Sequence, residues 1–122
     1  MKLKNIMIVV TNIDKSVDFY RELFGLQVIL NGDKNVILTE GLVLQEKEEW
    51  EENIGGIIKT NSKSFELYFE ERNVDRFKDK LKRLYPDIKF MNDLTTYSNG
   101  KQIIRFCDLD GHIIEVGTKL ID

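Results

Sequence analysis

The hydrophobic and polar positions of this chain follow two periods, and the same succession of periods occurs twice. Residues 3–11 are largely apolar and β-branched, which predicts a strand. Apolar positions then recur at helical spacing, between an N-cap at Asn12 and a stop at Gly25. Three strands are expected next, at about 26–31, 35–40 and 42–47, separated by turn residues.

The second half of the chain repeats this order. A strand is predicted at about 65–71, and Asn73 is expected to cap a helix that Pro86 ends. Three further strands are predicted at about 88–92, 101–107 and 112–118. Between the halves, the sequence predicts a short helix around Trp50 and then a connecting loop.

A slide of 61 residues aligns segment 12–23 with segment 73–84. Asn, Asp, Asp and Leu are identical at four aligned positions, and three further positions keep their chemical type. Two similar capped helices would also give this match, but the strands repeat as well. We therefore predict an α+β fold in which residues 1–122 form a single domain of two βαβββ modules, about 1–61 and 62–122.

The repeat also selects polar positions on the predicted strands. Alternate strand residues face opposite sides of a sheet, so apolar residues such as Ile8 should pack on the helices and leave the polar ones opposite. The positions equivalent between modules are Asn5, Gln45, Glu66 and Glu115. Two interpretations stay open for each: a place on the polar floor of a cleft, or exposure at a sheet edge.

Charge and composition narrow the classes of partner. Acidic and basic residues are interleaved and the net charge is −3, whereas nucleic-acid binding normally needs clustered Lys and Arg. The apolar run Ile6–Val10 is too short for a signal peptide or a membrane span. Cys107 is the one cysteine, and its apolar and acidic neighbours indicate a packing role. We expect a cytoplasmic protein with no nucleic-acid or membrane partner.

Three segments resemble the vicinal oxygen chelate superfamily, which includes glyoxalase I, bleomycin-resistance proteins and extradiol dioxygenases. They are Thr11–Leu26, Glu66–Asp75 and Phe106–Glu115, the last with Leu109 where the superfamily usually has Pro. The resemblance covers nearly the whole chain. It implies that the two βαβββ modules curl into an incomplete β-barrel around a cleft, and that a homodimer is the expected assembly.

The resemblance also implies where a metal would bind, and the chain departs from that pattern. Metal-dependent members place His, Glu and Gln ligands at the four positions named above, as a rule with at least one His. Here Asn5 stands where the first ligand is usually His or Gln, and Glu66 stands where His is usual, whereas Gln45 is tolerated and Glu115 matches. The one histidine, His112, lies three residues before Glu115, so we interpret it as a turn or surface residue.

An all-oxygen set suits Mg²⁺, Mn²⁺ or Ca²⁺ better than zinc, nickel or iron. No cofactor is therefore expected, and a divalent cation such as Mg²⁺ or Mn²⁺ is the alternative. Its candidate ligands are Gln45, Glu66 and Glu115. Arg105 lies between two apolar residues, so alternation leaves open whether its side chain faces the cleft.

Three functions remain open. The first is metal-free binding of a polar or cationic small molecule in an acidic cleft, as in the bleomycin-resistance branch. The second is a lyase, isomerase or epimerase in which Glu66 or Glu115 is the general base and a divalent ion stabilises an enediolate. The third is a non-catalytic structural or regulatory dimer. The candidate ligand-binding residues are Asn5, Met7, Gln45, Trp50, Glu66, Tyr68 and Glu115, with Glu70 a further acidic group.

Overall fold

A computed structural model describes residues 1–119 of the chain. Residues 120–122, at the end of the second predicted module, lie outside the described residues. The chain divides into two compact units, 1–60 and 61–122. This boundary lies beside the one drawn from the repeat, while the prediction that both modules make a single domain stays a prediction.

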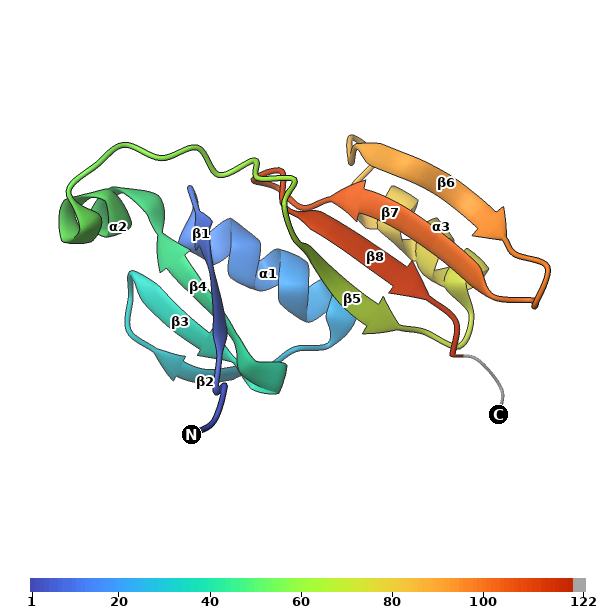
Figure 1. Ribbon diagram of the computed structural model, residues 1–122, viewed down its shortest axis with the longest axis horizontal. Helices are drawn as coiled ribbons and strands as arrows, with labels where there is room; N and C mark the ends of the chain where they lie inside the picture. The colour runs from blue at the N-terminus through green and yellow to red at the C-terminus, as the bar shows by residue number, and fades with distance from the viewer. Residues whose placement is uncertain (120–122) are drawn as a thin grey trace. The chain divides into compact units, whose positions relative to one another are not determined.

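The first module has the βαβββ order followed by one more helix (Figure 1). Its sheet has the strand order β1-β4-β3-β2, in which β1 and β4 are parallel and the other pairs are antiparallel. Its elements are β1 (Ile6–Val10), α1 (Ile13–Phe24), β2 (Val28–Asn31), β3 (Asn35–Leu38), a 3₁₀ turn (Thr39–Gly41), β4 (Leu42–Glu46) and α2 (Lys47–Ile54).

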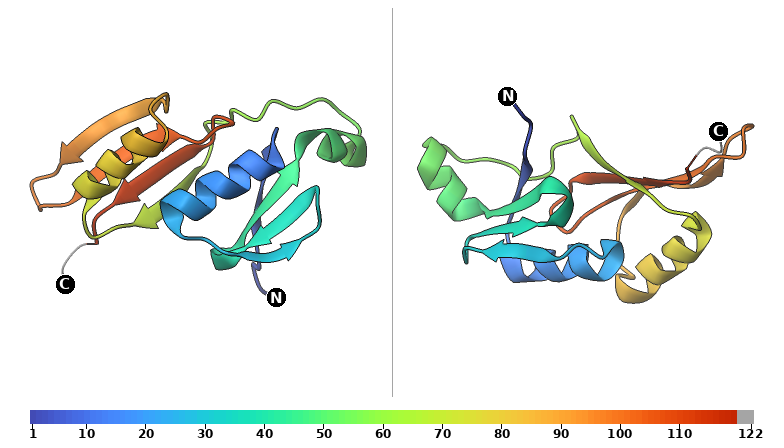
Figure 2. Two further views of the ribbon diagram at one scale, coloured as in Figure 1. Left: turned by 180° about the vertical axis from the view of Figure 1, so that it is seen from behind. Right: turned by 90° about the horizontal axis from the view of Figure 1, so that it is seen from below.

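The second module repeats the βαβββ order, and its sheet has the matching strand order β5-β8-β7-β6. Figure 2 shows α3 lying across one face of this sheet, as α1 does on its own sheet. The elements are β5 (Glu66–Glu70), α3 (Val74–Leu84), β6 (Phe90–Thr96), β7 (Gln102–Cys107) and β8 (Ile113–Gly117). The α+β class and the two βαβββ modules are confirmed, and each sheet is open rather than closed into a barrel.

Local signals explain the ends of the two main helices. The side chain of Asn12 accepts a hydrogen bond from the backbone N–H of Lys15 (3.0 Å), and Asn73 does the same for Arg76 (2.9 Å). Gly25 ends α1 with φ 68°, a left-handed conformation that glycine adopts without steric cost. Tyr85 ends α3 immediately before Pro86, which cannot continue a helix.

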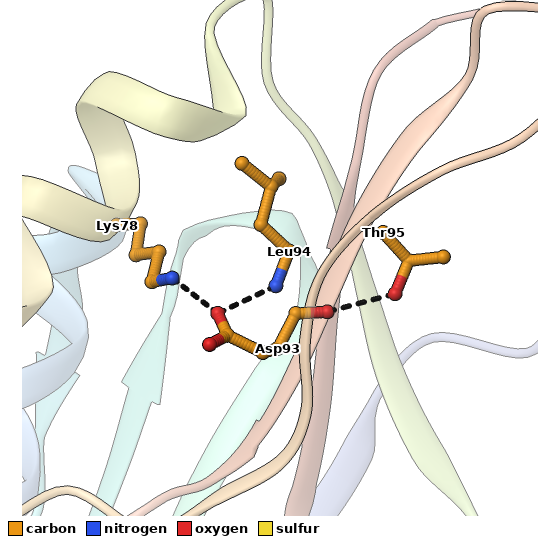
Figure 3. Close-up of polar contacts among 4 residues, drawn as sticks. All are labelled: Lys78, Asp93, Leu94 and Thr95. Atoms are coloured by element: carbon orange, nitrogen blue, oxygen red, sulfur yellow. Dashed lines mark hydrogen bonds and ion pairs between the residues drawn. The ribbon is translucent and has the colours of Figure 1, made fainter.

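Strand β6 was predicted at about 88–92 but spans Phe90–Thr96, so this boundary was wrong. Its pairing with β7 is irregular between Asn92 and Thr95. Figure 3 shows what stabilises the irregular segment: the Asp93 carboxylate accepts a hydrogen bond from the Leu94 N–H and pairs with Lys78 of α3. Thr95 donates its hydroxyl to the Asp93 carbonyl (2.9 Å). Polar side chains therefore continue the strand where the apolar alternation stops.

Candidate functional site

Arg105 lies on the face of the second sheet that is opposite α3. Its neighbour Phe106 packs against Phe77 of α3, with ring centroids 6.1 Å apart. Because successive strand residues face opposite sides, Arg105 must face away from the helix. Arg105 therefore shares the face of its own sheet that carries Glu115, its partner in the strand register.

Arg105 joins residues from the three other strands of this sheet. Its Nη2 lies 2.6 Å from Glu115 Oε1 on β8, its Nε lies 3.5 Å from Glu66 Oε1 on β5, and its Nη1 donates to Asn92 Oδ1 on β6 (2.9 Å). Arg105 and Glu115 are also directly opposite in the strand register. We call these four residues the Arg105 cluster.

The exposed fractions of the side chains show that Glu115 depends most on its partner in the cluster. The Glu115 side chain is 11% exposed, against 39% for Glu66 and 34% for Arg105. A carboxylate this buried needs a nearby cation or donors, because desolvation without them is costly. Arg105 supplies that cation at short range. Because the cluster has two carboxylates and one guanidinium group, its net charge is negative by one.

Tyr68 lies on the same face, opposite Glu115 in the register of β5 and β8. The ammonium group of Lys101 lies 4.9 Å from the centre of its ring. A hydrogen bond with the Tyr68 hydroxyl raises the pKa of Lys101, and the charges of Glu115 and Glu70 act in the same direction. The second module therefore gathers three of the candidate ligand-binding residues, Glu66, Tyr68 and Glu115, on one face.

Gln45 occupies the corresponding place in the first module and is 4% exposed. Its side-chain oxygen accepts from Asn35 Nδ2 (2.8 Å), and its nitrogen donates to the Glu46 carbonyl (3.1 Å). Both ends of the carboxamide are therefore engaged by the protein. Met7 shares this face of the sheet because it lies two residues before Val9, the register partner of Gln45.

Asn5 does not occupy the place that the slide of 61 residues assigned to it. It is exposed and precedes β1. Glu66 lies two residues before Tyr68, the register partner of Glu115, whereas Asn5 lies four residues before Val9, the partner of Gln45. Met7 is therefore the register equivalent of Glu66. The two-residue offset corresponds to about 7 Å along a strand.

The two remaining residues of interest are Trp50 and His112. Trp50 is half-buried on α2, the helix that follows β4. The description of His112 as a turn residue agrees with its place before β8, but its assignment to the surface was wrong, since it is 3% exposed. Its Nδ1 lies 2.8 Å from Asp108 Oδ2, and this contact offsets the free-energy cost of burying the polar imidazole ring.

The cysteine has the packing role expected from its neighbours. Cys107 is a buried free thiol, and burial, together with the charge of Asp108, raises its pKa. A thiol of this kind stays protonated at neutral pH and is a poor nucleophile. Cys107 therefore takes no part in the site.

The donor set does not fit the divalent metal that the superfamily resemblance implies. Glu66 and Glu115 are both paired with Arg105, and the Gln45 oxygen is taken by Asn35. Within each module, residues 1–119 contain no group of three His, Cys, Asp or Glu side chains that could surround an ion. A divalent ion that bound Glu66 and Glu115 together would have to displace the guanidinium group of Arg105.

Asn35, Asn92, Lys101 and Arg105 were not assigned to the site from the sequence. One signal was present, because a slide of 70 residues aligns Asn35 with Arg105 and Gln45 with Glu115. In the strand register, Asn35 is opposite Gln45, and Arg105 is likewise opposite Glu115. Residues at directly opposite strand positions interact, so a polar pair that recurs in both hairpins could have been predicted from the hairpin register. Lys101 carries no such signal, because it follows an irregular turn.

Comparison with known families decides the relationship. The glyoxalase-like domain matches residues 3–121 of this chain. The chain belongs to the glyoxalase-like family. A search of curated proteins gives no match.

Several solved structures share the fold of this chain. A protein of unknown function from Agrobacterium tumefaciens is 29% identical, with a TM-score of 0.84 over 98% of this chain and 95% of that one. A glyoxalase-related enzyme from Fulvimarina pelagi is 18% identical (TM-score 0.81, 98% and 88% covered). The fosfomycin resistance protein FosX from Listeria monocytogenes is 16% identical (TM-score 0.76, 98% and 93% covered). The last two likenesses show the fold alone.

Proposed function

We propose that this glyoxalase-like protein binds a polar or cationic small molecule without a tightly bound transition metal. The observation that carries the proposal is the Arg105 cluster, in which a guanidinium group lies between Glu66 and Glu115. An internal cation there supplies the charge that a metal would otherwise bring. The surrounding face keeps a negative balance, which favours a cationic ligand over an anionic one.

The cluster also argues against Glu66 or Glu115 as a general base. All three nitrogens of the Arg105 guanidinium contact side chains of the protein, two of them carboxylates. A general base must reach a substrate proton, whereas the nearest carboxylate oxygens of Glu66 and Glu115 are turned toward the guanidinium group. We therefore propose a binding role for these two glutamates rather than a catalytic one.

Metal analysis of protein purified without chelator tests the proposal directly. We expect far less than one equivalent of any divalent ion, and no change of melting temperature with Mg²⁺ or Mn²⁺. The Arg105→Met variant should gain stabilisation by Mn²⁺, because the two carboxylates lose their internal cation. Arg83→Met, on the exposed side of α3, is the matched control and should behave like wild type. A stoichiometric divalent ion in the wild-type protein would overturn the proposal in favour of a metal-dependent lyase or isomerase.

Ligand screening by thermal shift tests the second half of the proposal. Cationic metabolites should raise the melting temperature more than neutral molecules of the same size. Glu115→Gln should weaken such binding about tenfold or more, since a hydrogen bond to a charged group contributes roughly 1.5–3 kcal/mol. If no small molecule of any charge shifts the melting temperature, a structural or regulatory role becomes the better explanation.

We propose further that the protein acts as a homodimer in the cytoplasm. Strand β2 lies at an edge of the first sheet, and its residues Val28, Ile29 and Leu30 are 37%, 65% and 60% exposed. An apolar edge strand of this kind is suited to pairing with another copy. The buried unpaired Cys107 accords with a reducing compartment. None of the helices among residues 1–119 is long and apolar enough to cross a membrane.

A further inference from the structure

The ring of Tyr68 lies directly over the backbone of β8. A Cβ atom built on Gly117 would come within 2.8 Å of the Tyr68 hydroxyl oxygen and 3.1 Å of its Cε1. Real Cβ atoms do not approach so closely, so any side chain at position 117 would push the ring away. Glycine at this position therefore allows the aromatic ring to lie along the sheet, where 43% of the tyrosine stays exposed.

Lys101 already places a cation on this ring. Its ammonium group is 4.9 Å from the ring centre, within the range of a cation–π contact. Glu70 shares the face of Tyr68, because the two residues are separated by one position on β5, and Glu115 is opposite Tyr68 on β8. The ring and these two carboxylates together make a place where an ammonium group is stabilised.

The turn that precedes Lys101 is exposed and does not cover the Lys101 side chain where it lies over the Tyr68 ring. Residues 97–100, which connect β6 to β7, are all exposed. Their turn is closed by the Tyr97 N–H bonded to the Lys101 carbonyl (2.8 Å), which fixes the backbone of Lys101, while its ammonium group is held by the ring and the hydroxyl of Tyr68. An exposed cation–π contact and one hydrogen bond at the surface are together weak enough for a competing cation to replace them.

We propose that the Tyr68 ring, with Glu70 and Glu115, forms a subsite for an alkylammonium group, and that Lys101 occupies this subsite as a displaceable internal cation. The inference rests on the proposed function and names the chemical class of its ligand. A quaternary ammonium fits the subsite especially well, since it binds an aromatic face without needing hydrogen-bond acceptors.

Titration with choline tests the proposal, with the neutral isostere 3,3-dimethyl-1-butanol as the matched probe. Binding is followed through the NMR signals of the Tyr68 ring, in the presence of a chelator. Lys101→Met should bind choline roughly two- to fivefold more tightly than wild type, the value of the exposed cation–π contact it no longer makes. Choline should exceed the neutral isostere in affinity for both proteins.

Two variants separate loss of the subsite from a general effect of charge. Lys82→Met removes a lysine that lies over Phe90 (5.7 Å) in the same module and changes net charge equally, so it should leave choline affinity at the wild-type value. Gly117→Ala should weaken choline binding by displacing the Tyr68 ring. Circular dichroism identifies a variant that fails to fold, and Tyr68→Leu, followed by calorimetry, then gives the second measurement.

Each outcome bears on one proposal only. Equal choline affinity in wild type and Lys101→Met, or equal affinity for choline and its isostere, would overturn the subsite while leaving the metal-free function intact. A stoichiometric metal in the wild-type protein would overturn the metal-free function. The choline titration would still decide the subsite, because its readout is the Tyr68 ring and the chelator removes the ion.

Discussion

At Asp108, one buried carboxylate binds three groups of the turn between β7 and β8. Its Oδ1 accepts the backbone N–H groups of Asp110 and His112, both at 2.9 Å, and its Oδ2 contacts the His112 ring. The two side chains of the pair are 2% and 4% exposed. Water cannot readily replace the carboxylate at such a site, so its loss would leave buried polar groups without an acceptor.

We therefore expect Asp108→Ala to destabilise the protein by about 2–4 kcal/mol, the cost of leaving several buried donors unpaired. The midpoint of urea unfolding should fall while the slope of the transition stays the same. Asp87→Ala removes an exposed aspartate from the same module and should change stability little. A drop of equal size in the control would show that the effect does not come from the turn.

Reactivity of Cys107 follows from its burial and raised pKa. In the native protein at pH 8, a thiol reagent should label it at least tenfold more slowly than in urea, where one thiol per chain should react at once. The labelling rate should rise with pH above 9, as the thiolate begins to form. Rapid labelling of the folded protein at neutral pH would contradict the packing role.

At the scale of the element, the sequence predicted helices better than strands, for a physical reason. Helix ends carry local chemical signals, namely the Asn12 and Asn73 caps, Gly25 and Pro86, and each works through neighbouring residues. Strand ends depend on partners distant in the sequence. Strand β6 continues past its apolar residues only because β7 pairs with it and Asp93 stabilises its irregular segment.

The same distinction applies to the site. Alternation placed Glu66 and Tyr68 on one face of their own strand, and the repeat selected Glu115 on the last strand, without knowledge of any partner strand. It could not orient Arg105, since the apolar residues on both sides of β7 are buried, Ile103 at 2% and Ile104 at 0% exposed. Nor could it reveal that Asn5 is offset by two residues, because the register of a parallel pair is set by contacts across the sheet.

The contact between α3 and β6 should make stability depend on pH in acid. Hydrogen bonds from Lys78 and from the Leu94 N–H lower the pKa of Asp93 below its usual value of 3.8. A lowered pKa in the folded state contributes stability above pH 3.8, and that contribution is lost as pH falls through the folded value. Lys78→Met removes the larger of the two causes.

We expect Lys78→Met to melt below wild type at pH 6 and the difference to shrink as pH falls below 3.8, because Asp93 is progressively protonated there. Asp93→Asn is the control, because it removes the titrating group and should show the same convergence. Melting followed by circular dichroism at several pH values measures the difference. A constant gap between wild type and Lys78→Met from pH 6 down through the protonation of Asp93 would show that packing of the lysine stem, not its charge, stabilises this edge.

At the scale of the whole molecule, the repeat gives each module the same scaffold but a different polar pair. Gln45 with Asn35 is neutral, whereas Glu115 with Arg105 is an ion pair, although both stand at directly opposite strand positions. With Glu66 beside it, the charged version has one net negative charge, and for this reason we assign the proposed cation site to the second module. The first module also exposes apolar residues on its outer strand, β2.

The homodimer proposal is tested at that strand. Wild type should sediment at twice the chain mass of 14.3 kDa, and Leu30→Lys should shift the equilibrium towards monomer by tenfold or more, since a charge on an edge strand opposes pairing. Leu109→Lys makes the same change at a residue that is 44% exposed in the β7–β8 turn, and it should remain dimeric. A monomeric wild type at high concentration would exclude the dimer, and a dimeric Leu30→Lys would place its interface away from β2.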